Sequence, residues 1–439
     1  MKYQEALDYI ESLSTLGIVP GLQSVQELCR RLGNPQDRLK FVHVAGTNGK
    51  GSTLAFISTI LQCAGYQVGR YTSPAVFEYR ERFVVNGRMI SQKDFCRLLE
   101  QVKSACEEMV RAGLAHPTPF EVETALAFLY YVEKACDIVV METGMGGLMD
   151  ATNLVTTTEV AVLASISMDH MKFLGNNLGA IAEQKAGIIK KCCRVVSMAQ
   201  QPEAMEVVRG HAEVLGCPLT VADSSICKNI KYGIKKQSFS YGSWKNLEIT
   251  LAGKWQIDNA VLAVKAVEAL QEAGYEISEV ALRKGLKETS WPGRFCMISN
   301  KPMIIVDGAH NEDAAKRLAE TIEFYFTNKR IIYIMGILKD KEYEKIISLT
   351  HSLADQIITV TPPENPRAML AYELAQEIAK VHSQVTAVDS LEEAVEISRL
   401  LAEKDDVIIA FGSLSYLGRL IEIVEKQEQK GSKKNGRSK

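Results

Sequence analysis

Residues 39–53, LKFVHVAGTNGKGST, decide the fold of the first half of this chain. The largely apolar run 39–45 predicts a short buried strand. The glycines that follow it let the backbone turn sharply and approach a bulky anion. A helix that opens at Ser52 would add its unpaired N–H groups and the positive end of its dipole, and Lys50 would add a full charge. The stretch therefore predicts a phosphate-binding loop between a strand and a helix.

The spacing in this loop differs from that of the common Walker A loop. Val44 stands where the first glycine of that motif would lie, and Gly51 follows the lysine in place of serine or threonine. The alternative is a glycine-rich strand-to-helix turn with an incidental lysine. Three glycines around one lysine favour phosphate binding over that alternative.

The composition is that of an ordinary globular protein, with 46% hydrophobic and 24% charged residues among 439. This length favours two domains. The formal net charge of −2 gives no general electrostatic reason to bind nucleic acid or a membrane surface. The N-terminus carries no apolar signal segment, and no apolar run approaches the ~20 residues of a membrane span. We therefore expect a cytoplasmic protein with no nucleic-acid or membrane partner, whose ten scattered cysteines are reduced.

Strand-like and helix-like segments alternate from residue 39 to about residue 221, and a fresh series begins at Met303. This alternation is typical of parallel, doubly wound sheets. We expect an α/β fold in which residues 1–297 form a P-loop mononucleotide-binding domain with a parallel sheet. A smaller Rossmann-like α/β domain is expected over residues 298–426. The basic end, residues 427–439, lacks apolar residues and is predicted to be disordered.

Polar residues follow three further predicted strands of the first domain. Ser73 comes after the strand 67–71, Glu142 directly after the strand 137–141, and His170 after the strand 160–165. Open α/β sheets place ligands at these strand ends. Hydroxyl and carboxylate oxygens suit Mg²⁺, whereas histidine is a less usual magnesium ligand. A capping role for His170 and a salt-bridge role for Glu142 stay open as alternatives.

A second polar group opens the second domain. Asp307, His310 and Asn311 directly follow the predicted strand 303–306, and Arg294 lies just upstream. A site at a domain interface would let each half supply part of the ligand's surroundings. The alternative is a capped turn in which Asp307 or Asn311 starts the next helix.

Ten motifs in this order make the chain resemble the folylpolyglutamate synthase family, which includes bifunctional dihydrofolate synthases and belongs to the Mur ligase superfamily. The resemblance spans about Tyr3 to Gly418. The motifs are GTNGKGS (46–52), TSP (72–74), FE (120–121), ETGMGGLMDATN (142–153), DH (169–170), QKAGIIK (184–190), QIDNA (256–260), WPGRF (291–295), DGAHN (307–311) and GILKDK (336–341).

The resemblance implies an ATP-dependent, Mg²⁺-dependent amide ligase, monomeric, that adds L-glutamate to the γ-carboxylate of tetrahydrofolate through an acyl phosphate. The first alternative is a bifunctional enzyme that also acts on dihydropteroate. A Mur-type cell-wall amino-acid ligase is less favoured, because those enzymes carry a UDP-sugar-binding domain ahead of the loop and only 45 residues precede Gly46 here. A non-catalytic ATP-binding protein is the remaining alternative.

The resemblance also implies roles for individual residues. ATP phosphates would be bound by the loop residues Gly46, Thr47, Asn48, Gly49, Lys50, Gly51 and Ser52. Magnesium would be held by Ser73, Glu142 and His170. The nucleotide site would be completed by Asn259, Arg294, Asp307 and His310. The pterin or pteroate pocket would be lined by Phe120, Glu121, Met149, Asp150 and Ala151. Catalytic roles fall to Lys50, His170 and Lys185, and Lys185 matches a lysine that the family carries as a carbamate.

Five positions depart from the family pattern. They are Ala75 for histidine, Leu148 for arginine, Gln184 for glutamate, Trp255 for histidine and Cys296 for glutamate. None of them is an expected phosphate or metal ligand. Ala75 and Leu148 bear on the anionic groups of the substrate, because an imidazole and a guanidinium are missing there.

Overall fold

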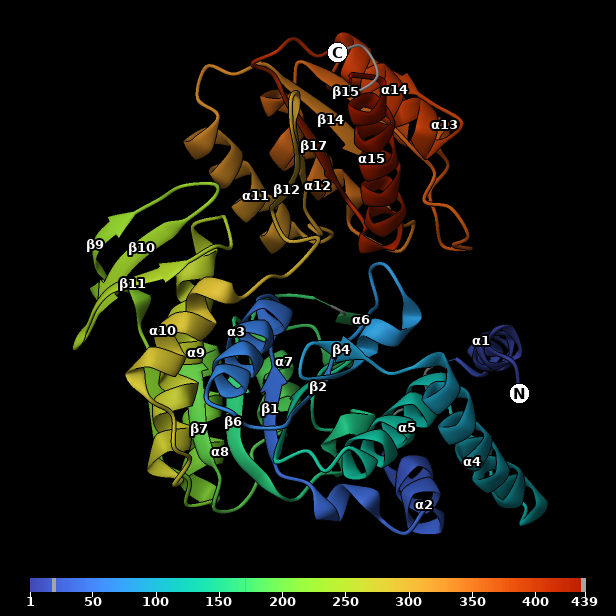
Figure 1. Ribbon diagram of the computed structural model, residues 1–439, viewed down its shortest axis with the longest axis vertical. Helices are drawn as coiled ribbons and strands as arrows, with labels where there is room; N and C mark the ends of the chain where they lie inside the picture. The colour runs from blue at the N-terminus through green and yellow to red at the C-terminus, as the bar shows by residue number, and fades with distance from the viewer. Residues whose placement is uncertain (18–20, 170, 436–439) are drawn as a thin grey trace. The chain divides into compact units, whose positions relative to one another are not determined.

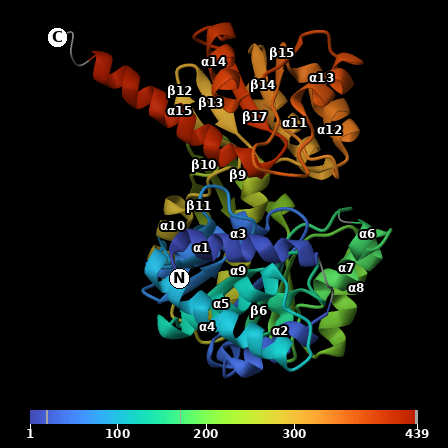
Figure 2. The same cartoon turned by 90° about the vertical axis from the view of Figure 1, so that its right-hand side faces the viewer.

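The computed structural model describes the chain except residues 18–20, 170 and 436–439 (Figures 1 and 2). The chain divides into two compact units. The first consists of Met1–Asn229, Phe239–Ile249 and Ile257–Thr289, and the second of Ile230–Ser238, Thr250–Gln256 and Ser290–Lys439. Each unit has its own mostly parallel sheet with helices packed on it, so the α/β prediction is confirmed. No helix of the described residues is both long and apolar enough to cross a bilayer.

The first unit is built on an eight-stranded sheet in the order β4-β3-β2-β5-β1-β6-β7-β8. β1 lies between β5 and β6, so the chain runs from β1 outward to β2 on one side and later to β6 on the other. Such a reversal is where open sheets bind ligands. The strands are β1 (Phe41–Ala45), β2 (Val68–Tyr71), β3 (Phe83–Val85), β4 (Arg88–Met89), β5 (Ile138–Glu142), β6 (Thr158–Leu163), β7 (Arg194–Met198) and β8 (Leu219–Ala222).

Most of this sheet is parallel, and only β3 and β4 run antiparallel to their neighbours. β3 and β4 form a hairpin. Its turn residues Asn86 and Gly87 have φ of 46° and 73°, which is the conformation that two-residue hairpin loops favour.

All five residues of β1 are buried, so the centre of the sheet is covered on both faces. On the face that Phe41 and Ala45 share, the apolar residues form two neighbouring clusters. One hydrophobic cluster, which includes Phe41, lies beneath α1, α2, α4 and α5. A second cluster, which includes Ala45, lies beneath α6, α7 and α8; α7 and α8 lie side by side (Figure 2). The helices are α1 (Tyr3–Ser12), α2 (Gln23–Arg31), α3 (Lys50–Cys63), α4 (Gln92–Arg111), α5 (Pro119–Glu133), α6 (Met171–Leu174), α7 (Leu178–Ala186), α8 (Pro202–Val214), α9 (Trp255–Glu272) and α10 (Glu279–Glu288).

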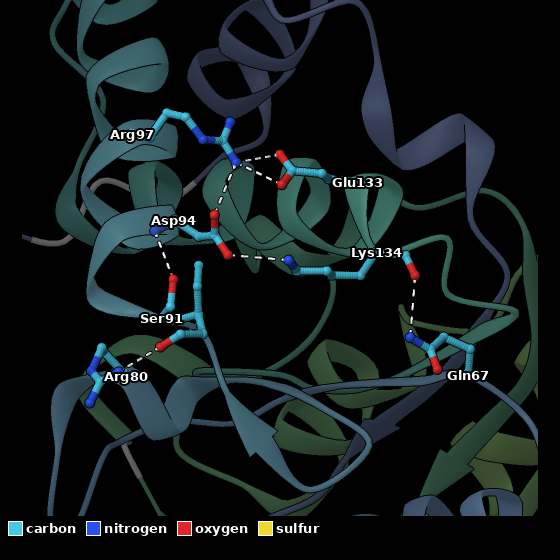
Figure 3. A network of polar contacts seen from close by, with 8 residues as sticks. Gln67, Arg80, Ser91, Asp94, Arg97, Glu133 and Lys134 are labelled. Atoms are coloured by element: carbon cyan, nitrogen blue, oxygen red, sulfur yellow. Dashed lines mark hydrogen bonds and ion pairs between the residues drawn. The ribbon is translucent and has the colours of Figure 1, made fainter.

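Polar contacts join α4 to α5 at the surface (Figure 3). The Ser91 hydroxyl accepts the N–H of Asp94 at 3.0 Å, which caps α4. Arg97 donates to Glu133 at 2.6 Å, and Lys134 donates to Asp94 at 3.2 Å. Surface ion pairs contribute little stability each. The pairing of α4 with α5 therefore depends mainly on the apolar side chains beneath them.

The second unit is built on a six-stranded sheet in the order β12-β13-β17-β14-β15-β16, of which only β12 is antiparallel. Apolar residues of α11, α12 and α13 pack in one cluster with Tyr333 and Phe411. The strands are β12 (Cys296–Asn300), β13 (Met303–Val306), β14 (Ile331–Met335), β15 (Gln356–Thr359), β16 (Val385–Ala387) and β17 (Val407–Phe411). The helices are α11 (Glu312–Tyr325), α12 (Tyr343–Thr350), α13 (Ala371–Ala379), α14 (Leu391–Leu401) and α15 (Leu414–Asn435).

A separate three-stranded sheet is formed within residues 228–249. It has the order β11-β10-β9, from β9 (Lys228–Lys231), β10 (Gln237–Tyr241) and β11 (Trp244–Ile249).

Residues 296–300, which contain the predicted domain boundary, form β12 and pair with β13. One segment differs from the sequence-based expectation. The helix α15 continues to Asn435, so residues 427–435 are helical where we predicted disorder. Glu, Gln and Lys in this stretch are good helix formers, and they extend a helix that the sheet already anchors. The boundary at residues 297 and 298 stays a prediction.

Candidate active site

The carboxyl ends of three neighbouring strands, β2, β5 and β1, bring the first group of predicted residues together. Val44 of β1 pairs with Glu142 of β5, and Tyr71 of β2 pairs with Met141 of β5. Because these strands are parallel and adjacent, the loop after β1, Ser73 after β2 and Glu142 at the end of β5 lie at one edge of the sheet. His170, the third expected metal ligand, lies outside the described residues.

The glycine-rich loop ends in a left-handed turn that starts α3. Gly49 has φ of 87° and precedes the first helical residue, Lys50. The helix begins two residues earlier than the sequence suggested, because glycine rather than the hydroxyl of Ser52 provides the turn. A Cβ at Gly49 would lie 2.4 Å from the Asn259 Oδ1 atom, so the loop backbone approaches α9 closely. The backbone amides at the start of this 14-residue helix are suited to an anion.

The segment after β6 holds the loop in place. Thr47 donates its N–H to the Ser165 carbonyl at 2.7 Å and its hydroxyl to the Ser167 carbonyl at 2.9 Å. The loop conformation is therefore fixed by the neighbouring strand end rather than by the glycines alone.

Lys50 and Glu142 bring opposite charges to this edge. The Lys50 Nζ atom lies 3.9 Å from Glu142 Oε1 and donates to the Thr47 carbonyl at 3.2 Å. Glu142 is buried, and Ser73 is half-buried at the end of the neighbouring strand. A carboxylate and a hydroxyl are hard oxygen donors of the kind that Mg²⁺ prefers, with phosphates and water as its remaining ligands. The donor set therefore fits magnesium, although no group of three acidic, histidine or cysteine side chains is gathered among the described residues.

Lys185 of α7 reaches the phosphate loop from beneath. It is buried, and its Nζ atom donates to the Gly46 carbonyl at 2.9 Å. Burial, together with the nearby charge of Lys50, lowers the pKa of Lys185 to about 7. An amine with such a pKa is largely neutral slightly above pH 7, which makes it a nucleophile.

The loop after β5 is organised by Asp150. Its carboxylate accepts the N–H of Met145 at 2.8 Å, the N–H of Thr152 at 3.0 Å and the Thr152 hydroxyl at 2.5 Å. Burial raises the pKa of Asp150, against the effect of these donors. The side chain of Met149 is 51% exposed, while Ala151 is buried. The structure thus divides the three predicted pocket residues between the surface and the interior of one loop.

The two predicted pocket residues of α5 also differ. The Phe120 ring packs on the same loop, since a Cβ at Gly144 would lie 2.6 Å from Phe120 Cζ. Glu121 closes a capping box in which it accepts the N–H of Thr118 at 2.7 Å and its hydroxyl at 2.8 Å, and it also accepts the Val25 N–H at 3.1 Å. The sequence carries this signal as Thr118 followed three residues later by Glu121. A substrate contact of Glu121 stays a prediction.

A buried ion pair near Ser73 was missed by the sequence reasoning. Arg82 donates to Glu123 of α5 at 2.6 Å, and the Tyr79 hydroxyl donates to the other oxygen of Glu123. The Arg82 carbonyl accepts the N–H of Thr72 at 3.3 Å, so this group holds the loop that carries Ser73. No local pattern announces the pair, because 41 residues separate its members.

The second unit carries the predicted residues Arg294, Asp307 and His310. Asp307 is buried and accepts the N–H of Phe295 and the N–H of Ala309, both at 2.8 Å. Burial raises the pKa of Asp307 to about 6, although the charge of Arg294 lowers it. The His310 Nδ1 atom lies 2.8 Å from the Gly308 carbonyl, to which it donates. Asn311 caps α11 by accepting the Ala314 N–H at 2.9 Å, as the capped-turn alternative predicted for it.

Two protein-family models match this chain. The model described as "Mur ligase middle domain" matches residues 44–267, and "Mur ligase, glutamate ligase domain" matches residues 293–414. A Bacillus subtilis relative named dihydrofolate synthase/folylpolyglutamate synthase is 37% identical over 425 residues, which cover 94% of this chain and 97% of that one. A Lacticaseibacillus casei folylpolyglutamate synthase is 32% identical, with 94% and 96% covered.

Solved structures of the same family share the fold. Thermotoga maritima folylpolyglutamate synthase has a TM-score of 0.83 at 32% identity and covers 96% of each chain. Escherichia coli FolC in complex with DHPP and ADP has a TM-score of 0.84 at 29% identity, with 98% of this chain and 99% of that one covered. The resemblance read from the ten motifs is confirmed. The chain belongs to the folylpolyglutamate synthase/dihydrofolate synthase family of the Mur ligase superfamily, and it is an ATP-dependent ligase.

Proposed function

We propose that this protein joins L-glutamate to the γ-carboxylate of tetrahydrofolate, as a folylpolyglutamate synthase. The observation that carries the proposal is the strand edge at which Lys50, Glu142 and Lys185 converge on one glycine-rich loop. This arrangement supports binding and activation of a nucleotide triphosphate. The acceptor is supported by the names of the relatives that this chain matches along nearly its whole length.

The reaction proceeds in two steps. An oxygen of the folate γ-carboxylate takes the γ-phosphoryl group of ATP, ADP leaves, and an acyl phosphate results. The amine of glutamate then attacks the acyl carbon, the C–N bond forms, the C–O bond to phosphate breaks and a proton is released. Phosphoryl transfer depends mostly on positioning and charge neutralisation. The amides at the start of α3 and the ammonium group of Lys50 supply both.

Ser73 and Glu142, with His170, would hold Mg²⁺ at this edge. When bound, the metal neutralises phosphate charge and orients the transferring group. Lys50 lies 3.9 Å from Glu142. We infer that this ion pair keeps the lysine directed at the strand edge where the phosphates would lie.

Lys185 is proposed to be carbamylated. Its neutral amine would attack the carbon of CO₂ and lose a proton, which replaces a buried cation by an anion. The low pKa supports this reaction, because the neutral amine is the reactive form. The change would also remove a positive charge that opposes that of Lys50, and it would provide another oxygen ligand for the metal.

The remaining predicted residues keep their proposed roles. The nucleotide site would be completed by Asn259, Arg294, Asp307 and His310, and the pteroate group would contact Phe120, Glu121, Met149, Asp150 and Ala151. We further propose a monomer without a nucleic-acid or membrane partner. A second activity on dihydropteroate is favoured by the double name of the Bacillus subtilis relative.

Incubation of the purified protein with ATP, Mg²⁺, L-glutamate and one acceptor at a time tests this function. We expect ADP release with tetrahydrofolate and a product heavier by one or more glutamyl residues, measured by mass spectrometry. A glutamylated product from dihydropteroate as well would establish the bifunctional alternative. ATP binding without ADP release on either acceptor would contradict both and support a non-catalytic protein.

A further inference from the structure

His43 is a buried polar residue in the middle of β1. Successive side chains of a strand point to opposite faces, so Phe41, His43 and Ala45 share one face of the sheet. Phe41 belongs to the hydrophobic cluster beneath α2, α4 and α5, and Ala45 belongs to the cluster beneath α7 and α8. His43, with 0% exposure, therefore lies where the two clusters meet. A polar group in such a place needs a hydrogen-bond partner.

Thr152 is that partner. The His43 Nε2 atom lies 2.9 Å from Thr152 Oγ1, and Thr152 Oγ1 lies 2.5 Å from Asp150 Oδ1. The threonine hydroxyl has one proton, which it donates to the carboxylate, so it accepts from histidine. This arrangement assigns the Nε2–H tautomer to His43. The imidazole is neutral, since burial lowers the pKa of His43 to about 3.

The chain His43–Thr152–Asp150 ends on the carboxylate that shapes the loop after β5. Through its other oxygen, Asp150 accepts the N–H of Met145 at 2.8 Å. The same loop is tied to the segment that follows α7, where Lys190 donates to the Asn153 carbonyl at 3.2 Å. A change in the side-chain angle of Asp150 would therefore move the loop that carries Met149 and Ala151.

We propose that His43 and Thr152 are positioning residues for the folate substrate. The buried chain fixes the orientation of the Asp150 carboxylate and of the loop around it, while the phosphate loop has its own supports at Ser165 and Ser167. The inference rests on the proposed function, in which this loop lines the pteroate pocket. It follows that loss of these hydrogen bonds weakens binding of the folate and leaves binding of ATP nearly unchanged.

Thr152 variants separate this role from simple support of the fold. Thr152→Val removes the hydroxyl at almost constant volume, and Thr152→Ser keeps it. Thr158→Val is the matched control, because Thr158 is a buried threonine of β6 whose hydroxyl has no partner in the described part of the chain. The measurement is steady-state kinetics of the full-length protein with ATP, Mg²⁺, L-glutamate and tetrahydrofolate, together with the melting temperature of each variant.

We expect Thr152→Val to raise the KM for tetrahydrofolate about 10-fold or more, the usual effect of losing a hydrogen bond to a charged group. The KM for ATP should change less than about 2-fold, because the phosphate loop keeps its hydrogen bonds. Thr152→Ser and Thr158→Val should keep the folate KM of the wild type. An unchanged folate KM in Thr152→Val, or equal increases in both KM values, would overturn the proposal.

His43 variants test whether the folate KM also depends on the hydrogen bond between His43 and Thr152. His43→Gln keeps an N–H donor, whereas His43→Leu removes it and should raise the folate KM as Thr152→Val does. Because both residues act through one hydrogen bond, the double variant should be no worse than Thr152→Val alone. A double variant in which the two increases in folate KM multiply would overturn the proposal. If His43→Leu does not fold, the comparison of His43→Gln with the Thr152 pair carries the test.

The wild-type protein separates the two conclusions. A wild type that glutamylates neither acceptor contradicts the proposed function. An active wild type whose Thr152→Val variant keeps its folate KM contradicts only the positioning role.

Discussion

At the scale of single residues, the site is governed by where charges are buried. Lys50 and Lys185 approach the same loop from two sides, and the Lys50 Nζ atom lies 3.9 Å from a carboxylate oxygen of Glu142. Burial lowers the pKa of Lys185, whereas Lys50 lies beside Glu142. The two lysines are therefore expected to serve different chemistry, one as a fixed cation and the other as a reactive amine.

Lys50→Ala should lower kcat by on the order of 10²–10³-fold, because it removes a charge from the transferring phosphoryl group. The protein should still fold, since the Lys50 side chain is partly exposed. The measurement is the rate of ADP release at saturating substrates. Lys40→Ala is the control, because the exposed Lys40 pairs with Glu159. A Lys50→Ala rate near that of the wild type would mean that the loop does not bind the reacting phosphates.

Lys185→Ala should also abolish most turnover, and added short-chain carboxylates such as acetate should restore part of it by replacing the carbamate. Lys191→Ala, at an exposed position close in sequence, should neither lose activity nor respond to acetate. The measurement is kcat with and without the carboxylate. If no added carboxylate, whatever its length, restores activity, a carbamate at Lys185 is contradicted.

His43 should make the stability of the fold sensitive to acid. Its pKa falls from 6.5 in the unfolded chain to about 3 in the folded protein. Between these values the unfolded state binds the proton, so stability falls as the pH falls below 6.5. The slope approaches about 1.4 kcal/mol per pH unit. Urea unfolding between pH 5 and 7 should give a steeper loss for the wild type than for His43→Gln. Parallel curves would contradict a buried neutral histidine.

At the scale of elements, the start of α3 combines backbone shape with close packing. Gly49 has a left-handed conformation and lies against Asn259 of α9. The first requirement is local, and the second depends on a helix more than 200 residues later in the chain. Glycine at this position therefore serves both the turn of the loop and the contact between two helices.

Gly49→Ala should weaken nucleotide binding as well as lower stability. The alanine Cβ would lie 2.4 Å from Asn259 Oδ1, so the loop must move away from α9. Gly33→Ala is a matched control, because Gly33 has φ of 82° and no neighbouring atom within 4 Å. Both variants should lose about 1 kcal/mol to backbone strain. Only Gly49→Ala should lose affinity for a non-hydrolysable ATP analogue, measured by calorimetry. Equal affinities would show that the contact with Asn259 does not matter.

At the scale of the whole molecule, ligand binding should appear as stability. A ligand that binds only the folded state raises the free energy of unfolding by about 2.7 kcal/mol at 100 times its dissociation constant. A non-hydrolysable ATP analogue with Mg²⁺ should therefore raise the melting temperature of the full chain. The shift should shrink when EDTA removes the metal and in Lys50→Ala. An equal shift without metal would argue against magnesium at Ser73 and Glu142.

The sequence by itself determined the parts of this protein that depend on neighbouring residues. The strand and glycines of residues 39–53, the cap at Ser91 and the alternating α/β pattern are local, because hydrogen bonding and side-chain periodicity within a segment produce them. The sequence also placed Ser73 and Glu142 at strand ends, since Ser73 comes shortly after the predicted strand 67–71 and Glu142 directly after the predicted strand 137–141. The family followed from the order of ten motifs.

Only the tertiary structure decided which of these segments become neighbours. β5 enters between β2 and β1, which places Glu142 beside Lys50. The structure also brought Thr152 to His43 across 109 residues, and it turned Glu121 into a helix cap that also binds Val25. Such pairings follow from how strands are ordered and how burial forces polar groups to find partners, and neither is written in any short stretch of sequence.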